Sequence, residues 1–561
     1  MEDIENSAND LTVNNDRIRQ VNQVQLKKPS KTGKNNNNEI IDENDKENNY
    51  LPGKQKVWVK TYGCSHNISD SEYMEGLLTQ YGYELVNESE NADVWLVNSC
   101  TVKDPSQAAF MNVVEKAKSK EKAIVVAGCV SQADRSLTGL EDVSMIGVSQ
   151  IDRVVEAVEQ TLQGNTIKLL AKKDLPKLDL PKVRKNPLIE IIPLSTGCLG
   201  SCTYCKTKQA RGKLGSYALE AIVERAKQVI SEGVSEIWLS SEDTGAYGRD
   251  IGTNIAELLR ALIAVLPPQG VMLRVGMTNP PYILEHLESI AEILNHPNVY
   301  SFLHVPVQAG SNKVLDAMNR EYTIEEFKQV ADSLINKVPN VTIATDIICG
   351  FPNEDENDFN ETISLIQSYQ FAIVNISQFY PRPGTPAAKM KRIPTQIVKE
   401  RSRRLTKLFE GFQPYLHYIG ETLNVYFDIE VSDNGLHCVG HTKAYVKVLV
   451  PYREDLPGSC HKVLIHAAQR FHIEGTLVEE VYPSNYYTMQ QEKAKQARLT
   501  QTNPGRTQGS NNHVSENPVA DLPPQITPVQ PTREERVNRK KQLLFLSTIA
   551  GILLILSQTK Q

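Results

Sequence analysis

Three short apolar runs near the start of the chain each end at a cysteine. They read K-V-W-V-K-T-Y-G-C to Cys64, D-V-W-L-V-N-S-C to Cys100 and A-I-V-V-A-G-C to Cys129. Each run has the length and residue types of a buried strand, and polar residues and a helical pattern follow it, as at 71–81. Alternating strands and helices predict a parallel sheet, whose strands all end at one edge. We therefore expect the three thiols to converge.

From residue 188 the chain alternates regularly between apolar β-rich runs and helical stretches. The expected strands are 189–194, 236–240, 271–275, 299–307, 342–348 and 371–379. The expected helices include 219–231, 255–265, 282–294, 324–338 and 359–368. Six such units predict an open, partial (β/α)6 TIM-like barrel, in which catalytic groups gather at the carboxyl ends of the strands.

Residues 413–482 change to short β-rich runs separated by turn residues, which predicts a small antiparallel barrel. The runs are 423–431, 444–450, 462–467 and 475–481. Barrels of this kind commonly hold nucleic acid, but many are only structural, and the pattern leaves both open.

The end of the chain is polar and then apolar. Residues 483–536 are rich in Pro, Gln and Asn, which predicts a flexible tether. An apolar run at 543–556 follows the basic residues Arg539, Lys540 and Lys541. This run is shorter than the usual span of about 20 residues. Its terminal position and basic flank nevertheless favour a C-terminal membrane anchor, best suited to a thin bilayer such as that of the endoplasmic reticulum.

The patterns together predict an α/β protein. It would have an N-terminal open parallel-sheet domain, a partial TIM-like barrel, a small C-terminal antiparallel β-barrel and a C-terminal transmembrane anchor. The expected parts are a disordered segment at 1–55, the N-terminal domain at 56–165, a linker at 166–187, the partial barrel at 188–412, the small barrel at 413–482, the tether at 483–541 and the anchor at 542–558.

Charge gives only a local signal. The net charge of −6 carries no overall nucleic-acid signature. Residues 172–213, however, contain ten Lys or Arg against three acidic residues, and residues 387–408 contain eight against one. Runs of charge are usually solvated faces. These two windows flank the predicted catalytic edge, where a polyanion would have to lie.

The segment 195–205 reads S-T-G-C-L-G-S-C-T-Y-C and contains Cys198, Cys202 and Cys205. A four-iron cluster needs one sulfur ligand per iron, so three cysteines leave one iron open for a substrate or cofactor. A zinc site usually has four ligands, and no second cysteine pair or nearby histidine completes one here. Disulfides fit poorly, because the nine cysteines are an odd number and no secretory signal is evident. The loop therefore favours an iron-sulfur cluster.

The cysteines at the three early strand ends predict a second cluster of the same kind. The alternative is that each is a small buried apolar residue, which is common at strand ends. For one cysteine we would prefer that interpretation, but three out of three favour a cluster. Among the other polar residues at strand ends, Gln308 and Asp346 are weaker candidates for the site, and Cys349 is expected to be a core thiol.

The C-x3-C-x2-C spacing, with Tyr204 before the last cysteine, resembles the signature of the radical S-adenosylmethionine (SAM) enzymes. With the three single cysteines and the small terminal barrel, residues 56–482 resemble the methylthiotransferases of that superfamily. The stretches S-T-G-C-L-G-S-C-T-Y-C-K-T-K-Q-A-R-G and S-S-E-D-T-G-A-Y-G are most similar to the archaeal and eukaryotic branch that modifies N6-threonylcarbamoyladenosine beside the tRNA anticodon. The apolar tail resembles that of the animal members.

This resemblance implies a tRNA (N6-L-threonylcarbamoyladenosine-C2)-methylthiotransferase with two 4Fe-4S clusters and SAM as cofactors. The SAM-cleaving cluster would be held by Cys198, Cys202 and Cys205. The auxiliary cluster, which carries or presents the inserted sulfur, would be held by Cys64, Cys100 and Cys129. One SAM would methylate that sulfur, and a second would yield the radical that activates C2 of the adenine ring. Glu242 would accept hydrogen bonds from the amino group of SAM.

The same resemblance implies the partners. The substrate would be tRNA, the barrel at 413–482 would correspond to the RNA-binding TRAM domain, and an unidentified reductase would supply electrons. The anchor would hold the enzyme in the endoplasmic reticulum membrane with its catalytic body facing the cytosol. Isopentenyladenosine or a ribosomal protein residue stays open as the substrate, because that choice rests on resemblance only. A non-catalytic iron-sulfur protein that binds RNA is the alternative from another class, and SAM cleavage would discriminate against it.

Overall fold

The computed structural model of the protein describes residues 52–484 and 486, apart from 102–103, 135–136 and 173. The segment before residue 52, most of the predicted tether and the predicted anchor at 542–558 lie outside the described residues. Within the part described, no helix is both long and apolar enough to cross a membrane. The expected α/β class, with parallel sheets and a β-rich C-terminal region, is confirmed.

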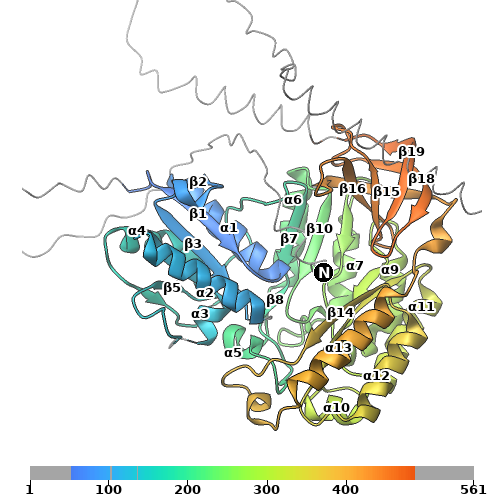
Figure 1. Cartoon of the computed structure of the whole chain (residues 1–561). Helices are drawn as coiled ribbons and strands as arrows, with labels where there is room; N and C mark the ends of the chain where they lie inside the picture. Colours follow the sequence, from blue (N-terminus) through green and yellow to red (C-terminus); the bar gives the residue numbers. More distant parts are fainter. Residues whose placement is uncertain (1–51, 102–103, 135–136, 173, 485, 487–561) are drawn as a thin grey trace, which may run out of the picture. The chain divides into compact units, whose positions relative to one another are not determined.

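The first part of the described chain is a six-stranded parallel sheet in the order β2-β1-β3-β4-β5-β6 (Figure 1). Its strands are β1 (Lys56–Thr61), β2 (Glu84–Val86), β3 (Val94–Ser99), β4 (Ala123–Gly128), β5 (Ser144–Ile146) and β6 (Lys168–Leu169). Its helices are α1 (Ser65–Tyr81), α2 (Asp104–Ser119), α3 (Cys129–Ala133) and α4 (Val154–Leu162). Strands β1, β3 and β4 are neighbours, so their carboxyl ends share one edge.

The alternation of side chains along β3 explains why helices cover both faces of this sheet. Val94 and Leu96 pack into a cluster with residues of α1 and α4, whereas Trp95 and Val97 pack into another with residues of α2. Successive side chains of a strand point to opposite faces, so a strand that is apolar at every position needs a cover on each side. The continuous apolar runs of the sequence therefore correspond to strands that are covered by helices on both faces.

Six further parallel strands form two sheets of three, in the orders β11-β10-β7 and β12-β13-β14. They are β7 (Ile189–Pro193), β10 (Glu236–Ser240), β11 (Met272–Arg274), β12 (Phe302–His304), β13 (Thr342–Cys349) and β14 (Ile373–Gln378). A parallel bridge between Leu273 and Val299 joins the two sheets, so the six strands follow chain order as in a partial barrel. The short strands β8 (Ser195–Thr196) and β9 (Gly215–Ser216) pair with each other beside it.

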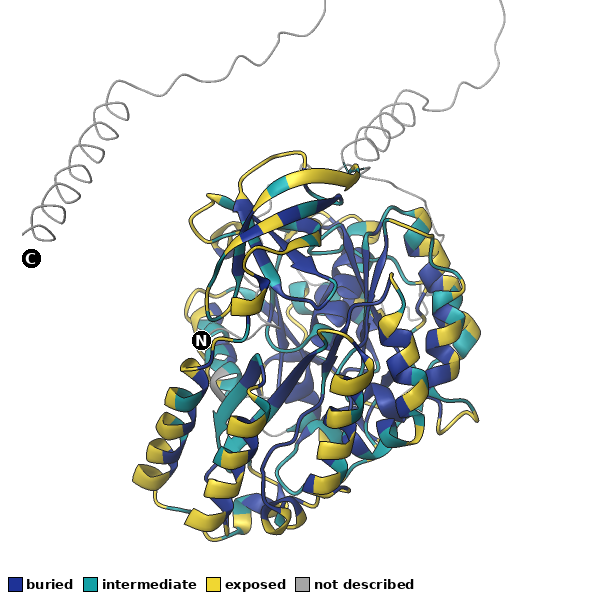
Figure 2. Ribbon diagram, turned by 90° about the vertical axis from the view of Figure 1, so that its right-hand side faces the viewer, coloured by how far each residue is buried: buried dark blue, intermediate teal, exposed yellow. Residues whose placement is uncertain are grey.

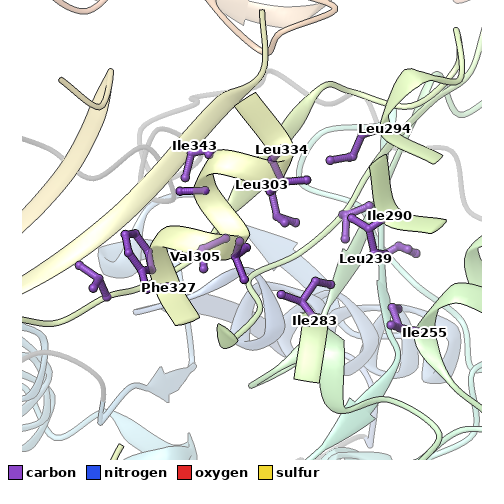
Figure 3. Packing of buried hydrophobic residues seen from close by; sticks show 14 of the residues in the cluster. Leu239, Ile255, Ile283, Ile290, Leu294, Leu303, Val305, Phe327, Leu334 and Ile343 are labelled. Carbon is purple, nitrogen blue, oxygen red and sulfur yellow. The ribbon is translucent and has the colours of Figure 1, made fainter. Parts of the chain in front are cut away.

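Helices pack on the outer side of these strands. They are α5 (Thr207–Arg211), α6 (Leu219–Ser231), α7 (Ile255–Ile263), α8 (Pro280–Ile283), α9 (Leu287–Asn295), α10 (Asn312–Ala317), α11 (Ile324–Lys337), α12 (Glu356–Tyr369) and α13 (Thr395–Glu410). Figure 3 shows Leu239 and Leu303 from the strands together with Ile290 and Leu334 from the helices, all in one buried cluster. Figure 2 shows the helices buried along one side and exposed along the other. Each such buried side chain contributes about 1.5–3 kcal/mol.

The last described element is a closed barrel in the order β15-β16-β17-β19-β18. Its strands are β15 (Thr422–Val431), β16 (His437–Thr442), β17 (Lys447–Pro451), β18 (Cys460–Ala468) and β19 (Ile473–Tyr482). The turn between β16 and β17 reaches the partial barrel. There Tyr445 packs with Tyr300 and Phe302, and Nζ of Lys443 donates to the carbonyl oxygen of Leu294 at 2.8 Å. The small barrel thus packs against the amino ends of the inner strands.

Candidate functional site

A cavity of about 260 Å³ lies at the carboxyl ends of the strands. Five of the six predicted cluster cysteines and Glu242 line it. These residues are Cys64, Cys129, Cys198, Cys202, Cys205 and Glu242. Cys100 does not line the cavity, but it lies behind Gly63, because a Cβ atom at Gly63 would come within 2.5 Å of the Cys100 sulfur. The structure therefore brings the predicted site residues into one region.

The loop of the three-cysteine motif is shaped by glycine and by backbone hydrogen bonds. Gly197 has a φ of +78°, and a Cβ there would come within 2.2 Å of the carbonyl oxygen of Lys213. The amide of Thr203 donates to the carbonyl oxygen of Met318 at 2.9 Å, which fixes the middle of the loop to the end of α10. Nζ of Lys208 donates to the carbonyl oxygens of Leu199 and Gly200 at 2.8 and 3.1 Å. These contacts fold the loop into a compact turn.

The other three cysteines lie at the shared edge of the N-terminal sheet. Cys64 is the residue before α1, Cys100 follows β3 and Cys129 begins α3. Asn67 connects the ends of β1 and β3, because its Nδ2 donates to the carbonyl oxygens of Tyr62 and Ser99 at 2.9 and 2.8 Å. The thiol of Cys129 lies 3.6 Å from Oδ1 of Asn67. The side chain of Asn67 thus contacts the chain at the ends of all three strands.

The two thiol sets suit 4Fe-4S clusters by their donor chemistry. Each set offers three sulfurs, which is the donor that such clusters require. Gly200 lies against the motif thiols, since a Cβ there would be in van der Waals contact with the sulfurs of Cys198 and Cys202, at 3.6 and 3.9 Å. Burial raises the pKa of Cys129 and of Cys198 to about 12. A bound metal ion would deprotonate these thiols, and a nearby cation would offset the resulting charge.

Arg211 is that cation for the N-terminal set. It lies at the end of α5, its side chain is 2% exposed, and it interacts electrostatically with Cys129 and Cys64. Its Nη2 donates to Asn67 Oδ1 and Asp70 Oδ2, each at 2.7 Å. Arg211 follows the motif by six residues in the chain, so it joins the motif segment to α1.

Glu242 belongs to the same buried network. Nε of Arg211 lies 3.0 Å from its Oε1, and Nδ1 of His66 lies 3.2 Å from the same atom. Burial raises the pKa of Glu242, but His66 and Arg211 outweigh it and hold the pKa below its usual value. The other oxygen, Oε2, is buried and has no hydrogen-bond partner among the described residues. One oxygen of the carboxylate therefore remains available to a ligand.

Arg320 is the buried cation beside the three-cysteine motif, as Arg211 is beside the N-terminal thiols. Its Nη1 lies 3.1 Å from the sulfur of Cys202 and 3.4 Å from the hydroxyl of Tyr204, and its Nη2 donates to Oδ1 of Asn279. Nδ2 of Asn279 in turn donates to Asp243 at 2.7 Å. Burial raises the pKa of Asp243 to about 6, against the hydrogen bonds from Asn279.

The structure also places the weaker candidates. Gln308 and Asp346 line the cavity, and Oδ1 of Asp346 lies 2.9 Å from Nε2 of His304. Cys349 is buried in the main core. Sequence reasoning missed His66 and Arg320, and Arg211 stood only inside a motif quoted for resemblance. Their neighbours in the chain carry no periodic or spacing signal, so only the fold reveals them.

A separate buried set joins Glu236 of β10 to Asp428 and His441 of the small barrel. One potential ligand atom from each lies within 4.8 Å of the others. Both oxygens of Glu236 already accept hydrogen bonds, from Tyr300 at 2.6 Å and from Trp238 at 2.8 Å. This set therefore serves the contact between the small barrel and the partial barrel.

The first basic window differs from the exposed surface that the sequence suggested. The side chain of Lys182 is only 2% exposed and forms ion pairs with Glu72 and Glu190 at 3.2 and 3.1 Å. Lys206 and Arg211 are buried as well. These side chains neutralise internal carboxylates, because a buried charge needs a partner. The second window keeps more exposed cations, including Lys399, Arg403 and Lys407 on α13.

Comparison with known proteins gives two family matches and several relatives. Residues 192–366 match the radical SAM superfamily, and residues 56–146 match the uncharacterized protein family UPF0004. The threonylcarbamoyladenosine tRNA methylthiotransferase of Drosophila pseudoobscura pseudoobscura is 56% identical over 437 residues, which are 77% of this chain and 78% of that protein. The Homo sapiens protein of the same name is 54% identical over 77% of this chain and 75% of its own length.

The similarity extends to an archaeon. The probable threonylcarbamoyladenosine tRNA methylthiotransferase of Pyrococcus abyssi (strain GE5 / Orsay) is 39% identical over 404 residues, which are 71% of this chain and 94% of that protein.

Proposed function

The chain belongs to the family of threonylcarbamoyladenosine tRNA methylthiotransferases, and from this premise we propose how its cavity performs the reaction. It is a radical SAM enzyme that inserts a methylthio group at C2 of N6-threonylcarbamoyladenosine in tRNA, with SAM and two 4Fe-4S clusters as cofactors. The observation that carries the assignment of residues is that five of the six thiols line one cavity, while the sixth, that of Cys100, lies behind Gly63.

The ligands of each cluster follow from this placement. Cys198, Cys202 and Cys205 would hold the cluster that binds SAM. The auxiliary cluster would be held by Cys64, Cys100 and Cys129. When bound, these clusters supply the electron that cleaves SAM and the sulfur that is transferred. The chain itself keeps the thiol sets in register, because Arg211 contacts α1 of the N-terminal sheet and Glu242 of the partial barrel.

The polar groups between the thiols would orient SAM. Oε2 of Glu242 is buried and without a partner, so it is suited to accept a hydrogen bond from the amino group of SAM. Asn279 positions Asp243, and Arg320 offsets the charge of the Cys202 thiolate. Ser65 and His66, in the first turn of α1, also line the cavity, so the N-terminal sheet domain contributes to its wall.

The surface that meets tRNA is proposed from charge. The exposed cations of α13, among them Lys399, Arg403 and Lys407, would contact phosphates, and the small barrel would bind RNA as a TRAM-like module. The apolar run at 543–556 would anchor the enzyme in the endoplasmic reticulum membrane. Fractionation of the full chain and of a chain ending at residue 541 tests the anchor: only the full chain should be recovered with membranes.

The direct test of the function is mass spectrometry of tRNA after anaerobic reaction. The reconstituted chain, given reductant and SAM, should bind about eight irons. It should release 5′-deoxyadenosine and convert N6-threonylcarbamoyladenosine into its 2-methylthio form. About four irons would contradict the assignment of Cys64, Cys100 and Cys129. Bound zinc without SAM cleavage would contradict the enzymatic function as a whole.

A further inference from the structure

Arg274 is a buried cation on the wall of the cavity. It is the last residue of β11, and its side chain lies on the inner face of the partial barrel, because the adjacent Leu273 packs into the outer core. Arg274 lines the cavity and is 9% exposed. A guanidinium this deeply buried normally requires hydrogen bonds and a counter-charge.

Aromatic rings, not acceptors, surround this guanidinium. Its Cζ lies 4.9 Å from the ring centroid of Trp238, 5.0 Å from that of Phe302 and 4.8 Å from that of Tyr445. Rings attract the cation by their faces but accept none of its five N–H donors in the usual geometry. Nε of Arg274 is buried and has no hydrogen-bond partner among the described residues. The rings hold the guanidinium in place and leave its buried Nε–H without an acceptor.

The nearby carboxyl group of Glu236 does not fill this role. It interacts with Arg274 through space only, while its two oxygens accept from Tyr300 and Trp238. Burial raises the pKa of Glu236, which weakens it further as a counter-charge. The two other buried arginines on the cavity differ. Arg211 pairs with Asp70, and Arg320 donates to Asn279.

We propose that Arg274 binds the threonyl carboxylate of N6-threonylcarbamoyladenosine and so selects this nucleoside over adenosines without a carboxylate. The inference rests on the proposed function and deepens it. A planar guanidinium matches a carboxylate with two parallel hydrogen bonds, and such charged pairs are strongest where water is excluded. Phe302, which also lines the cavity, would flank the rest of the substituent.

Two other anions take part in the reaction, the carboxylate of SAM and the phosphates of tRNA. Phosphates are carried on the outside of the RNA strand, whereas Arg274 is a buried residue at the end of an inner strand. The cysteine loop, where SAM binds, is held by α10 and α5. The threonyl carboxylate is the anion that projects from the base itself.

The first experiment changes the substrate and leaves the protein intact. Anticodon stem-loop RNAs would carry N6-threonylcarbamoyladenosine or the same group with its carboxylate converted to a carboxamide. Binding and methylthiolation are measured with the cluster-reconstituted full chain. A charged hydrogen-bonded pair predicts a kcat/KM about 10- to 100-fold lower for the carboxamide, with weaker RNA binding to match. Equal values for the two RNAs would overturn the proposal.

The second experiment changes the residue. Arg274→Gln should lower kcat/KM for the natural RNA by about 10- to 100-fold and remove the preference over the carboxamide. Arg274→Lys should retain part of that preference, because it keeps the charge and loses the fork. Arg470→Gln is the matched control. Arg470 also stacks on an aromatic ring, because its Cζ lies 3.9 Å from the ring centroid of Phe409. It does not line the cavity.

The outcomes separate this proposal from the function on which it rests. If the unaltered chain does not methylthiolate the natural RNA, the proposed function fails. If it does and Arg274→Gln still discriminates between the two RNAs, only the role of Arg274 fails. If Arg274→Gln no longer forms 5′-deoxyadenosine from SAM in the absence of RNA, Arg274 acts on SAM, which would also overturn the proposal. An equal loss on both RNAs would indicate a purely structural role.

Discussion

Arg211 and Asp70 form a buried ion pair, with Nη2 of the arginine 2.7 Å from Oδ2 of the aspartate. The pair joins α5, which follows the three-cysteine loop, to α1, which follows Cys64. The two proposed cluster sites are therefore connected through one guanidinium, which also contacts Glu242. The geometry between the sites depends on this residue.

Arg211→Met should destabilise the fold by about 3–5 kcal/mol, because it removes the guanidinium that pairs with the buried carboxylates of Asp70 and Glu242. Urea titration followed by tryptophan fluorescence measures the change. Arg260→Met is the control, since Arg260 is exposed and lies 3.5 Å from Glu292. That surface pair should contribute less than about 1 kcal/mol. Similar losses in the two variants would contradict the importance of the buried network.

The two thiol sets should separate by function. Cys202→Ala should abolish SAM cleavage, whereas Cys100→Ala should retain cleavage and block methylthio insertion. Each variant should bind about four irons instead of about eight. Cys349→Ala is the matched control, because that thiol is buried in the core away from the cavity, and it should keep both clusters. Normal product formation by either of the first two variants would count against the two-cluster scheme.

The regular elements were largely predictable from the sequence. Strand β10 and helix α6 have the predicted bounds, 236–240 and 219–231. Strand β10 is a short run of consecutive apolar residues, whereas the buried positions of α6, among them Ile222, Ala226 and Val229, recur along one helix face and its exposed side is mainly charged. Where one face is buried against a single core, the pattern of the chain reports the structure directly.

The functional interface was not predictable in this way. Helix α1 was expected at 71–81 but begins at Ser65, because its first turns bury polar residues such as His66, Asn67 and Asp70. A helix that buries polar groups shows no amphipathic period. Strand β16 was missed for a related reason: the run H-C-V-G-H-T contains few apolar residues, yet His441 is buried against the partial barrel. Sequence patterns therefore fail where polar residues are buried at a functional site or at a contact between domains.

Glu190 should make stability depend on acidification. Burial raises the pKa of this carboxylate, but Lys182, Arg184 and Arg225 outweigh it and hold the pKa at about 2. The unfolded chain takes up the proton near pH 4.5 and the folded chain only near pH 2, so stability is present above pH 4.5 and is lost on going down to pH 2. The expected loss is about 3 kcal/mol.

The measurement for this group is the difference in unfolding free energy between the unaltered chain and Glu190→Gln. The difference should be largest at pH 6 and should shrink towards pH 3, because below pH 4.5 the unfolded chain binds a proton at Glu190 while the folded chain does not. The matched control is Glu292→Gln, whose carboxylate is exposed. A difference that stays constant from pH 6 to pH 3 would contradict the low pKa of Glu190.

Glu242 offers the sharpest test of how SAM is held. One of its oxygens is occupied by Arg211 and His66, and the other is buried without a partner. Glu242→Gln keeps the shape but removes the charge and replaces one acceptor with a donor. If the carboxylate accepts from the amino group of SAM, the KM for SAM should rise about 10-fold or more. Iron content should stay unchanged, as measured on the reconstituted chain, because Glu242 is not a cluster ligand. Loss of iron with an unchanged KM would instead mean that Glu242 acts by holding Arg211 between the two thiol sets.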